Sequence, residues 1–380
     1  MIITTFNRAG FLRESLTSVL TQSRPPLEVI VVDDGSTDDT PAVVQGFGRD
    51  VVYIRKDNGG KAAAINFALP RARGDYLWLF DDDDVALPEA IEQRLDVLRV
   101  RRELRWIFSS HYYGTTGPDG RIVRGTKAEV RVNPEGDLFY RLLTHCFFLL
   151  QSCLIDRNCV VQIGNFTESL LRSQDYDLLL RLACRFEFSG IEEPTFILRR
   201  HGGMRGPLVE RHAVTERLRI WSKYDRYIGS WIRGGVELGN FTRNPWSASA
   251  ASPVDARLAL IKRAVVMASK GLIPEMIEDC VNASTMRAES LSNDERISCE
   301  RLLRCYQFWL VYRSNAPAFW QGVRALSKTR VGREMLMRFF IGLLQQAKWH
   351  DTRWTERRHH LSMSLRILAE CGVRGWRYGG

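Results

Sequence analysis

The sequence predicts an α/β fold: a mainly parallel sheet flanked by helices, followed by a mainly α-helical C-terminal region. In the N-terminal half, short apolar runs alternate with helix-like segments, which is the order typical of a parallel sheet. Three of the apolar runs end in polar loops, and two of these loops carry adjacent carboxylates. The C-terminal half instead reads as a series of helices. We therefore expect two domains, residues 1–205 and residues 206–380.

The N-terminal elements follow one another in the order β-α-β-α-β-α-β. Strands are expected at residues 2–5, 27–32, 51–55 and 76–80, and helices at residues 11–22, 40–47 and 62–69. The second strand is apolar along nearly its whole length, as expected for a strand that is covered on both faces. In open α/β folds, ligands bind outside the carboxyl ends of the strands. The polar loops are therefore expected to form the functional edge of the sheet.

The C-terminal half is expected to be helical. Its helices are predicted at residues 210–227, 253–270, 274–283, 294–312, 316–327, 332–349 and 355–371. The apolar segment at residues 335–344 is too short to span a bilayer.

Four consecutive aspartates, Asp81 to Asp84, follow the apolar run at residues 76–80 and are the most informative feature of the chain. Like charges at such close range repel one another, so the cluster requires a counter-charge. A hard divalent cation with oxygen ligands, Mg²⁺ or Mn²⁺ shared with a phosphate, would supply it. The alternative is a solvated acidic loop, or the cap region of the helix that begins near Pro88.

The glycines of this chain are not spaced as in two other classes of nucleotide-binding protein, the dinucleotide-binding domains and the P-loop proteins. A dinucleotide-binding domain requires G-x-G-x-x-G directly after the first strand, and residues 5–10 do not match this pattern. A P-loop requires G-x-x-x-x-G-K-[ST], and residues 59–61 lack the preceding spacing.

Four motifs, at residues 2–8, 29–38, 58–66 and 74–84, resemble those of the family 2 glycosyltransferases. They read IITTFNR, VIVVDDGSTD, NGGKAAAIN and GDYLWLFDDDD. The resemblance covers residues 1–205 and implies the GT-A fold and a nucleotide-activated sugar as donor. The order and spacing of the motifs are specific for the family and say little about the substrate.

The resemblance implies which residues bind the donor. Thr4 and Phe6 match positions that line the base pocket, and Asp34 matches the carboxylate that reads the nucleobase or ribose. Lys61 lies where a basic residue approaches the diphosphate. The alternatives are structural: Asp34 capping the next loop, and Phe6 belonging to the core.

The aspartate cluster matches the D-x-D region of the family. By this resemblance Asp83 is the direct ligand of a divalent metal, Mg²⁺ or Mn²⁺, and Asp81 and Asp82 face the donor. His201 is expected to be a second metal ligand or a contact to the diphosphate, and its alternative is a purely structural histidine.

The catalytic base is expected at Asp175. An inverting transfer requires a carboxylate that takes the proton from the acceptor hydroxyl, and residues 173–181 resemble the family motif that carries it. A carboxylate in the first turn of a helix is favoured in its ionised form by the helix dipole. Asp177 and Arg181 are expected to form a structural i,i+4 pair. A plain helix cap is the alternative for Asp175.

The resemblance implies a hexosyltransferase, metal-dependent and inverting, that moves a sugar from a nucleotide-diphosphate donor to a saccharide or lipid-linked hydroxyl. UDP is the default nucleotide, and the expected setting is polysaccharide or glycan biosynthesis. Two alternatives remain open from the sequence. One is a non-catalytic protein that binds sugar nucleotides or acts as a scaffold. The other is a sugar nucleotidyltransferase, although the Gly-rich loop with a basic residue that such enzymes carry after the first strand is not found.

Charge is distributed unevenly along the chain. The formal net charge is +10, and residues 1–205 carry 26 basic and 28 acidic side chains, so residues 206–380 have a net charge of +12. Eight of the ten tryptophans also follow residue 205. Basic, tryptophan-rich helices can lie on an anionic membrane, and the alternative is an ordinary helical appendage with a core of aromatic residues. No nucleic-acid motif accompanies the basic charge, so nucleic acid is not expected as a partner.

The eight cysteines are scattered without any C-x-x-C pair. This pattern is typical of reduced, buried thiols in a cytosolic protein. We expect no signal peptide before the first strand. We expect a cytoplasmic protein that associates peripherally with the inner face of the membrane.

Overall fold

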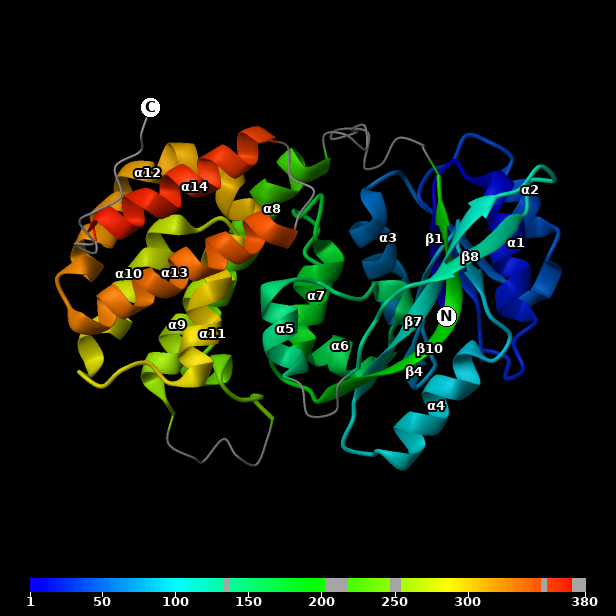
Figure 1. The fold of residues 1–380 in the computed structure, drawn as a ribbon. Helices are drawn as coiled ribbons and strands as arrows, with labels where there is room; N and C mark the ends of the chain where they lie inside the picture. The colour runs from blue at the N-terminus through cyan, green and yellow to red at the C-terminus, as the bar shows by residue number, and fades with distance from the viewer. Residues whose placement is uncertain (133–136, 202–216, 247–253, 350–353, 371–380) are drawn as a thin grey trace. The chain divides into compact units, whose positions relative to one another are not determined.

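The computed structural model describes the chain except for residues 133–136, 202–216, 247–253, 350–353 and 371–380. Two compact units are present (Figure 1). The first comprises Met1–Leu142 and Cys146–Leu218, and the second comprises Leu143–His145 and Arg219–Gly380. The domain boundary predicted between residues 205 and 206 lies outside the described residues.

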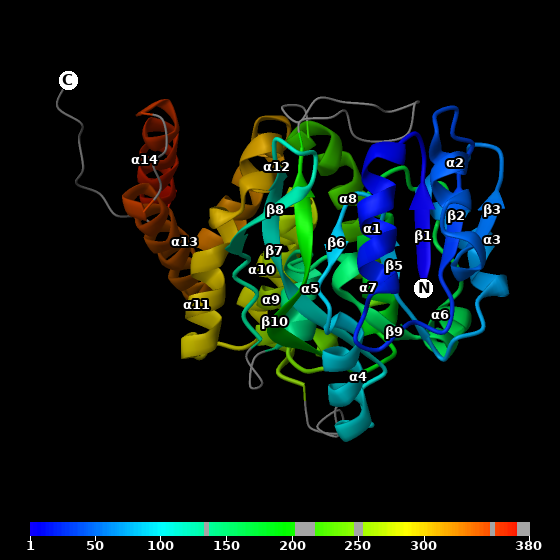
Figure 2. The ribbon, with the colours of Figure 1, turned by 90° about the vertical axis from the view of Figure 1, so that its right-hand side faces the viewer.

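Sheet A of the first unit is a four-stranded parallel sheet with the order β3-β2-β1-β5 (Figure 2). Its strands are β1 (Ile2–Thr5), β2 (Ile30–Asp33), β3 (Val52–Arg55) and β5 (Leu79–Asp81). The register pairs Thr5 with Asp33 and Thr4 with Asp81, so the polar residues that end these strands lie in one row. The predicted parallel sheet is confirmed, and its carboxyl edge is where the polar loops gather.

The helices α1 (Ala9–Leu20), α2 (Thr40–Gln45) and α3 (Gly60–Ala68) connect the strands of sheet A. Leu12, Leu16 and Val19 of α1 are fully buried and belong to one apolar core with Ile3 and Val31 of the sheet. Their i, i+4, i+7 spacing explains why this segment forms an amphipathic helix. The helix therefore covers the sheet and holds the ends of β1 and β2 in place.

The strand predicted at residues 76–80 is divided between two sheets. β4 (Tyr76–Leu77) pairs with β9 in sheet B, β5 pairs with β1 in sheet A, and Trp78 lies between them. Trp78 is buried, and its indole Nε1–H donates a hydrogen bond of 2.7 Å to the carbonyl of Gln151. The guanidinium of Arg94 lies 4.2 Å from the indole ring. The continuous apolar run did not reveal this division, because apolar residues occupy both halves of it.

Sheet B has the order β4-β9-β7-β10-β6, and β8 pairs with β7. The remaining elements of this unit are β6 (Val85–Ala86), α4 (Ala90–Val100), β7 (Trp106–Thr116), β8 (Ile122–Lys127), β9 (Leu154–Asp156), α6 (Arg157–Ile163), α7 (Gln174–Ala183) and β10 (Phe188–Arg200). β6 begins directly after Asp84 and pairs with β10 in antiparallel orientation. This pairing brings the end of β10 beside the aspartate cluster.

The second unit is helical, and its helices run from green at α8 to red at α14 in Figure 1. They are α8 (Arg217–Gly235), α9 (Ala256–Ser269), α10 (Ile273–Met286), α11 (Asn293–Arg301), α12 (Tyr306–Ser327), α13 (Arg330–Trp349) and α14 (Trp354–Glu370), while α5 (Leu138–Thr144) spans the division between the units. The fold class is thus confirmed: an α/β domain followed by a mainly helical region.

The single helix predicted at residues 294–312 is wrong, because α11 ends at Arg301 and α12 begins at Tyr306. Leu302 and Leu303 are buried in a 3₁₀ turn between these helices, so the apolar pattern continues across the break. α12 then runs through Pro317, where the sequence suggested a new helix start.

Buried charge pairs hold the helices of the second unit together. Arg257 of α9 donates hydrogen bonds of 2.6 and 2.7 Å to Glu295 of α11, and both side chains are almost completely buried. Asp279 of α10 is fully buried and pairs with Arg233 at 3.1 Å and Arg263 at 2.7 Å. In the part of the chain that the structure describes, no helix is long and apolar enough to cross a membrane.

Candidate functional site at the carboxyl edge of sheet A

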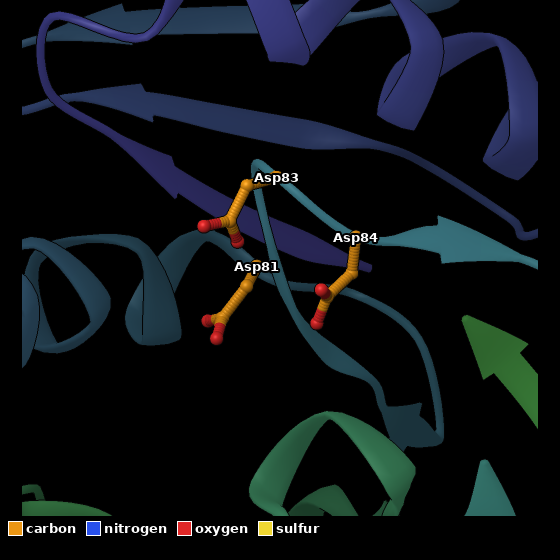
Figure 3. Close-up of side chains that lie close together, drawn as sticks. All are labelled: Asp81, Asp83 and Asp84. Atoms are coloured by element: carbon orange, nitrogen blue, oxygen red, sulfur yellow. The ribbon is translucent and has the colours of Figure 1, made fainter. Parts of the chain in front are cut away.

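The aspartate cluster lies at the end of β5 and in the turn that leads to β6. Figure 3 shows the side chains of Asp81, Asp83 and Asp84, whose carboxylates point to the same side of this turn. One potential ligand atom from each lies within 4.8 Å of the others. The oxygens are therefore close enough to share one small cation.

Arg8, in the loop after β1, is the nearest cation to the middle of the cluster. Its Nη1 atom lies 3.2 Å from Asp82 Oδ1 and also contacts Asp83 Oδ2. His201 Nε2 lies 2.9 Å from the same Oδ2 atom of Asp83. The two residues predicted to bind metal, Asp83 and His201, are thus in direct contact. Arg8 was not among the predicted site residues, although a basic residue directly after the first strand, within the motif at residues 2–8, was a signal for it.

The carboxylates of this cluster titrate differently. Burial raises the pKa of Asp82 to about 7, against the opposing effect of Arg8. The pKa of Asp83 is lowered, because His201 and Arg8 together outweigh the effect of burial. Asp83 is therefore the carboxylate of this pair that stays ionised in the absence of any metal.

Asp84 was not among the predicted site residues, yet it is fully buried beside them. It accepts hydrogen bonds of 3.0 Å from Gln151 Nε2 and 2.9 Å from the backbone N–H of Arg199. The Arg199 side chain is also buried; it donates to the carbonyl of Asp83 at 2.8 Å and contacts Glu14. These contacts join β10 to the turn and fix the position of the cluster.

Lys61, in the first turn of α3, connects the cluster to the predicted base. Its Nζ atom lies 2.8 Å from Asp81 Oδ1 and 3.5 Å from Asp175 Oδ2. Burial opposes the charge of Lys61, but Asp175 and Asp81 outweigh it and raise its pKa. Three residues predicted separately from distant motifs are therefore brought together.

Asp175 lies in the first turn of α7, and its two carboxylate oxygens have different surroundings. Its Oδ2 atom is the one near Lys61, whereas Oδ1 is inaccessible to solvent and has no hydrogen-bond partner in the described part of the chain. Burial raises the pKa of Asp175, and Lys61 opposes this effect. Asp177 and Arg181 form the predicted i,i+4 pair at 2.8 Å, and Asp177 is buried. The adjacent structural pair leaves Asp175 as the carboxylate of this turn that faces the cluster.

Asp34 organises the loop between β3 and α3. Its carboxylate accepts hydrogen bonds from Lys56 Nζ at 2.8 Å and from the backbone N–H groups of Gly59 at 2.9 Å and Gly60 at 2.7 Å. Gly60 has φ +87°, a conformation that L side chains rarely adopt. The residue predicted to read the nucleoside therefore also fixes the loop that begins α3.

The loops after β1 and β2 are joined to each other. Asn7, with φ +53°, receives hydrogen bonds at its Oδ1 atom from the N–H and the hydroxyl of Thr37. The backbone N–H of Asn7 donates to Ser36 Oγ at 2.9 Å. The predicted donor residues Thr4 and Phe6, at this end of β1, are both half-buried. The strand ends thus form one connected polar edge.

The comparisons with known proteins agree with this arrangement. A sequence model of the glycosyl transferase family 2 matches residues 1–144. An uncharacterised glycosyltransferase of Rickettsia prowazekii is 32% identical over 187 residues, which cover 47% of this chain and 56% of that protein. The N-terminal part of the chain belongs to glycosyltransferase family 2. A further uncharacterised member, from Methanocaldococcus jannaschii, is 26% identical over 51% of this chain and 67% of that protein.

The family 2 domain is also similar to larger enzymes and to a solved structure. The chondroitin synthase of Pasteurella multocida is 28% identical over 48% of this chain and 18% of that protein. TarS 1-349 of S. aureus, solved with UDP-GlcNAc, has a TM-score of 0.54 at 15% identity and covers 88% of this chain and 89% of that chain. At this identity the likeness shows the GT-A fold alone. The match spans only about half of the Rickettsia prowazekii relative, at 56% of its length.

The oxygens of the family 2 site fit a hard divalent cation. Asp81, Asp83 and Asp84 offer only carboxylate oxygens, which Mg²⁺ and Mn²⁺ prefer over sulfur or nitrogen. His201 Nε2 lies 2.9 Å from Asp83, so one imidazole nitrogen lies beside these oxygens. The predicted divalent metal is therefore compatible with the residues present.

Proposed function

We propose that this protein is a glycosyltransferase that moves a sugar from a nucleotide-diphosphate donor to a hydroxyl of a saccharide or lipid-linked acceptor, with inversion. The observation that carries the proposal is that Lys61 links the aspartate cluster to Asp175. Its Nζ atom lies 2.8 Å from Asp81 Oδ1 and 3.5 Å from Asp175 Oδ2. A donor site and a base must lie within the length of one sugar for such a reaction. The similarity to family 2 agrees with this activity.

The donor is expected to lie along the carboxyl edge of sheet A. Thr4, Phe6 and Asp34 would contact the nucleoside, and the loop that Asp34 holds would shape the base pocket. Lys61 would contact the diphosphate, and Asp81 and Asp82 would face the ribose or the sugar. UDP is the first nucleotide to test, because the TarS structure of similar fold was solved with UDP-GlcNAc.

A divalent metal held by Asp83, with His201 beside it, would stabilise the negative charge of the leaving diphosphate. The chain supplies the remaining chemistry. Asp175 takes the proton of the acceptor hydroxyl as the acceptor oxygen forms its bond to the anomeric carbon. The bond from that carbon to the phosphate oxygen breaks, and its electron pair leaves with the nucleoside diphosphate. Lys61 lies between the two ends of this displacement.

The helical unit is the part through which we propose peripheral contact with an anionic membrane. Arg313, Arg324 and Lys328 are exposed, and their spacing places them on one face of α12 and its end. Residues 302–333 contain no Asp or Glu, so this face has no acidic neighbour in its own segment. Each such cation adds about 1 kcal/mol of attraction to an anionic surface. Sedimentation with vesicles that contain anionic lipid, at low and high salt, would test the contact.

Polysaccharide or glycan assembly on the cytoplasmic side of the membrane is the setting that fits these proposals. The competing functions are a non-catalytic sugar-nucleotide-binding or scaffolding protein and a sugar nucleotidyltransferase. The first would bind nucleotide without turnover, and the second would release pyrophosphate from a nucleoside triphosphate. Both alternatives are separable by the products of the reaction.

The deciding experiment combines ligand binding with product detection. Thermal unfolding is recorded with UDP, other nucleoside diphosphates and their sugars, each with and without Mn²⁺. A ligand that binds only the native state raises the melting temperature, by about 5 °C when it is present well above its Kd. Each stabilising donor is then incubated with candidate acceptors, and the release of nucleoside diphosphate and the anomeric configuration of the product are measured.

Two variants make the result specific to the site. Asp83→Asn removes the charge of the proposed metal ligand and should abolish the metal-dependent shift. Asp96→Asn removes an exposed carboxylate on α4 that pairs with Arg99, outside the aspartate cluster, and should leave the shift unchanged. The absence of a shift with any nucleotide on the folded protein would refute the donor site.

A further inference from the structure

Arg8 lies between Asp83, the proposed metal ligand, and its neighbour Asp82 in the aspartate cluster. Its Nη1 atom lies 3.2 Å from Asp82 Oδ1 and in hydrogen-bond contact with Asp83 Oδ2. The same Oδ2 atom of Asp83 also accepts from His201 Nε2 at 2.9 Å. This oxygen therefore already has two partners from the protein itself. A metal ion that binds it must compete with at least one of them.

The backbone of Arg8 is fixed, whereas its side chain has room to move. The carbonyl of Arg8 accepts the backbone N–H groups of Phe11 and Leu12 at 3.0 and 3.1 Å, which begins α1. The side chain is 31% exposed, while those of Asp82 and Asp83 are 7% and 13% exposed. A long, flexible arginine can therefore leave the buried carboxylates without any change in the fold.

The charges explain why a cation sits there. Two adjacent buried carboxylates are unfavourable without a positive partner. Lys61 is bound to Asp81 and Asp175, and Arg199 donates to the backbone of Asp83, so neither serves Asp82. In the described part of the chain, Arg8 is the basic residue that forms ion pairs with both Asp82 and Asp83.

We propose that Arg8 is an internal counter-ion which a divalent cation displaces from Asp83. The inference rests on the metal site of the proposed function. Arg8 and the metal ion then compete for one oxygen atom, so the free protein binds the metal weakly. A donor diphosphate offers the displaced guanidinium a new anionic partner. Metal and nucleotide binding are thereby coupled through this positioning residue.

The test measures metal binding rather than activity. Mn²⁺ is titrated into the full chain by calorimetry, first alone and then with saturating UDP, for the wild type, Arg8→Gln and Arg8→Lys. If Arg8 holds Asp83 in nine molecules of ten, its removal tightens Mn²⁺ binding about tenfold. Arg8→Gln should show this gain, and UDP should strengthen its Mn²⁺ binding by a smaller factor than in the wild type. Arg8→Lys keeps the charge and should stay near the wild type.

Arg73→Ala is the matched control, because it removes an arginine that pairs with Glu28 at 3.0 Å elsewhere in the same unit. It should leave Mn²⁺ binding unchanged. Equal or weaker Mn²⁺ binding by Arg8→Gln, with native circular dichroism, would overturn the proposal and make Arg8 a structural support of the cluster. If the wild type binds no Mn²⁺ at all, the metal site of the proposed function fails instead, so the two failures are distinguishable.

Discussion

The ammonium group of Lys61 lies 3.5 Å from the Oδ2 atom of Asp175, across 114 positions of sequence. The same ammonium group lies 2.8 Å from Asp81 at the end of β5. One side chain at the start of α3 therefore sets the distance between the aspartate cluster and the first turn of α7. Among the described residues, Asp175 Oδ1 has no hydrogen-bond partner, whereas Oδ2 faces Lys61.

Replacing Asp175 by asparagine should remove turnover and preserve donor binding. The amide cannot take the proton of the acceptor, and general-base catalysis contributes about 10² to 10⁴ in rate. We expect kcat to fall by that factor while the thermal shift with UDP and Mn²⁺ persists. A variant that keeps more than a tenth of the wild-type kcat would exclude Asp175 as the base. Asp96→Asn serves as the charge-matched control.

Replacing Asp34 by alanine should weaken nucleotide binding and also destabilise the free protein. The carboxylate accepts from Lys56, Gly59 and Gly60, so its removal leaves three donors without their partner. The loss of such charge-assisted bonds amounts to roughly 2 to 4 kcal/mol. Thermal unfolding without ligand measures this effect, and titration with UDP measures the affinity. An unchanged melting temperature would mean that Asp34 serves the ligand alone.

The parallel sheet and its functional edge were predictable because both depend on local patterns. The apolar strands at residues 2–5 and 51–55 nearly coincide with β1 and β3, and the polar loops follow them as expected. The division of residues 76–80 at Trp78 was not predictable, because it depends on pairing with β9, far along the chain. Long-range pairing leaves no periodic signal in an apolar run.

The candidate site was predictable as a set of residues and not as a set of contacts. The motifs gave Asp81, Asp83 and Asp175, but no pattern indicated that Lys61 joins two of them. The contacts of Arg8 were not predictable from the sequence, because its partners lie 74 and 75 positions away. Contacts of this kind can be predicted only when the strand order is known, because they depend on β1 lying beside β5 in sheet A.

His111 should make the protein sensitive to acid. Burial, with a smaller effect of Arg200, lowers the pKa of His111 to about 4, and neither ring nitrogen has a hydrogen-bond partner among the described residues. In the unfolded chain the group titrates near 6.5. Between these values the unfolded state binds the proton first, so stability falls as the pH falls from about 6.5 to about 4.

The phenylalanine variant isolates this effect. His111 stacks on Phe196 with ring centroids 5.2 Å apart, so His111→Phe preserves the aromatic contact and removes the titration. Between pH 7 and pH 4 the variant should lose about 3 kcal/mol less free energy of unfolding than the wild type. Urea unfolding of both proteins at several pH values measures the difference. The contributions of the other titrating groups cancel, because the two proteins share them. Parallel curves for the two proteins would contradict the buried, neutral state of His111.

Two buried tryptophans allow a controlled test of the hydrogen bond that Trp78 makes where the chain passes from sheet B to sheet A. Trp78 donates to the carbonyl of Gln151 at 2.7 Å, whereas the indole nitrogen of Trp106 has no hydrogen-bond partner in the described ranges. Trp78→Phe leaves that buried carbonyl unpaired, which amounts to about 1 to 3 kcal/mol. Trp106→Phe loses only packing volume. Chemical unfolding should therefore show the larger destabilisation for Trp78→Phe, and the reverse order would refute a role for this hydrogen bond.

Gly322 in α12 should not tolerate a side chain. A Cβ atom there would lie 1.9 Å from Cγ1 of Ile277 on α10, so Gly322→Ala forces the two helices apart. Overpacking of this kind reduces stability by about 1 to 3 kcal/mol, and this outweighs the gain in helix propensity of about 1 kcal/mol. Thermal unfolding measures the result, with Gly234→Ala as a control, because a Cβ atom at Gly234 in α8 meets nothing within 4 Å. If Gly322→Ala is as stable as the control, α10 and α12 do not pack as closely as the structure has them.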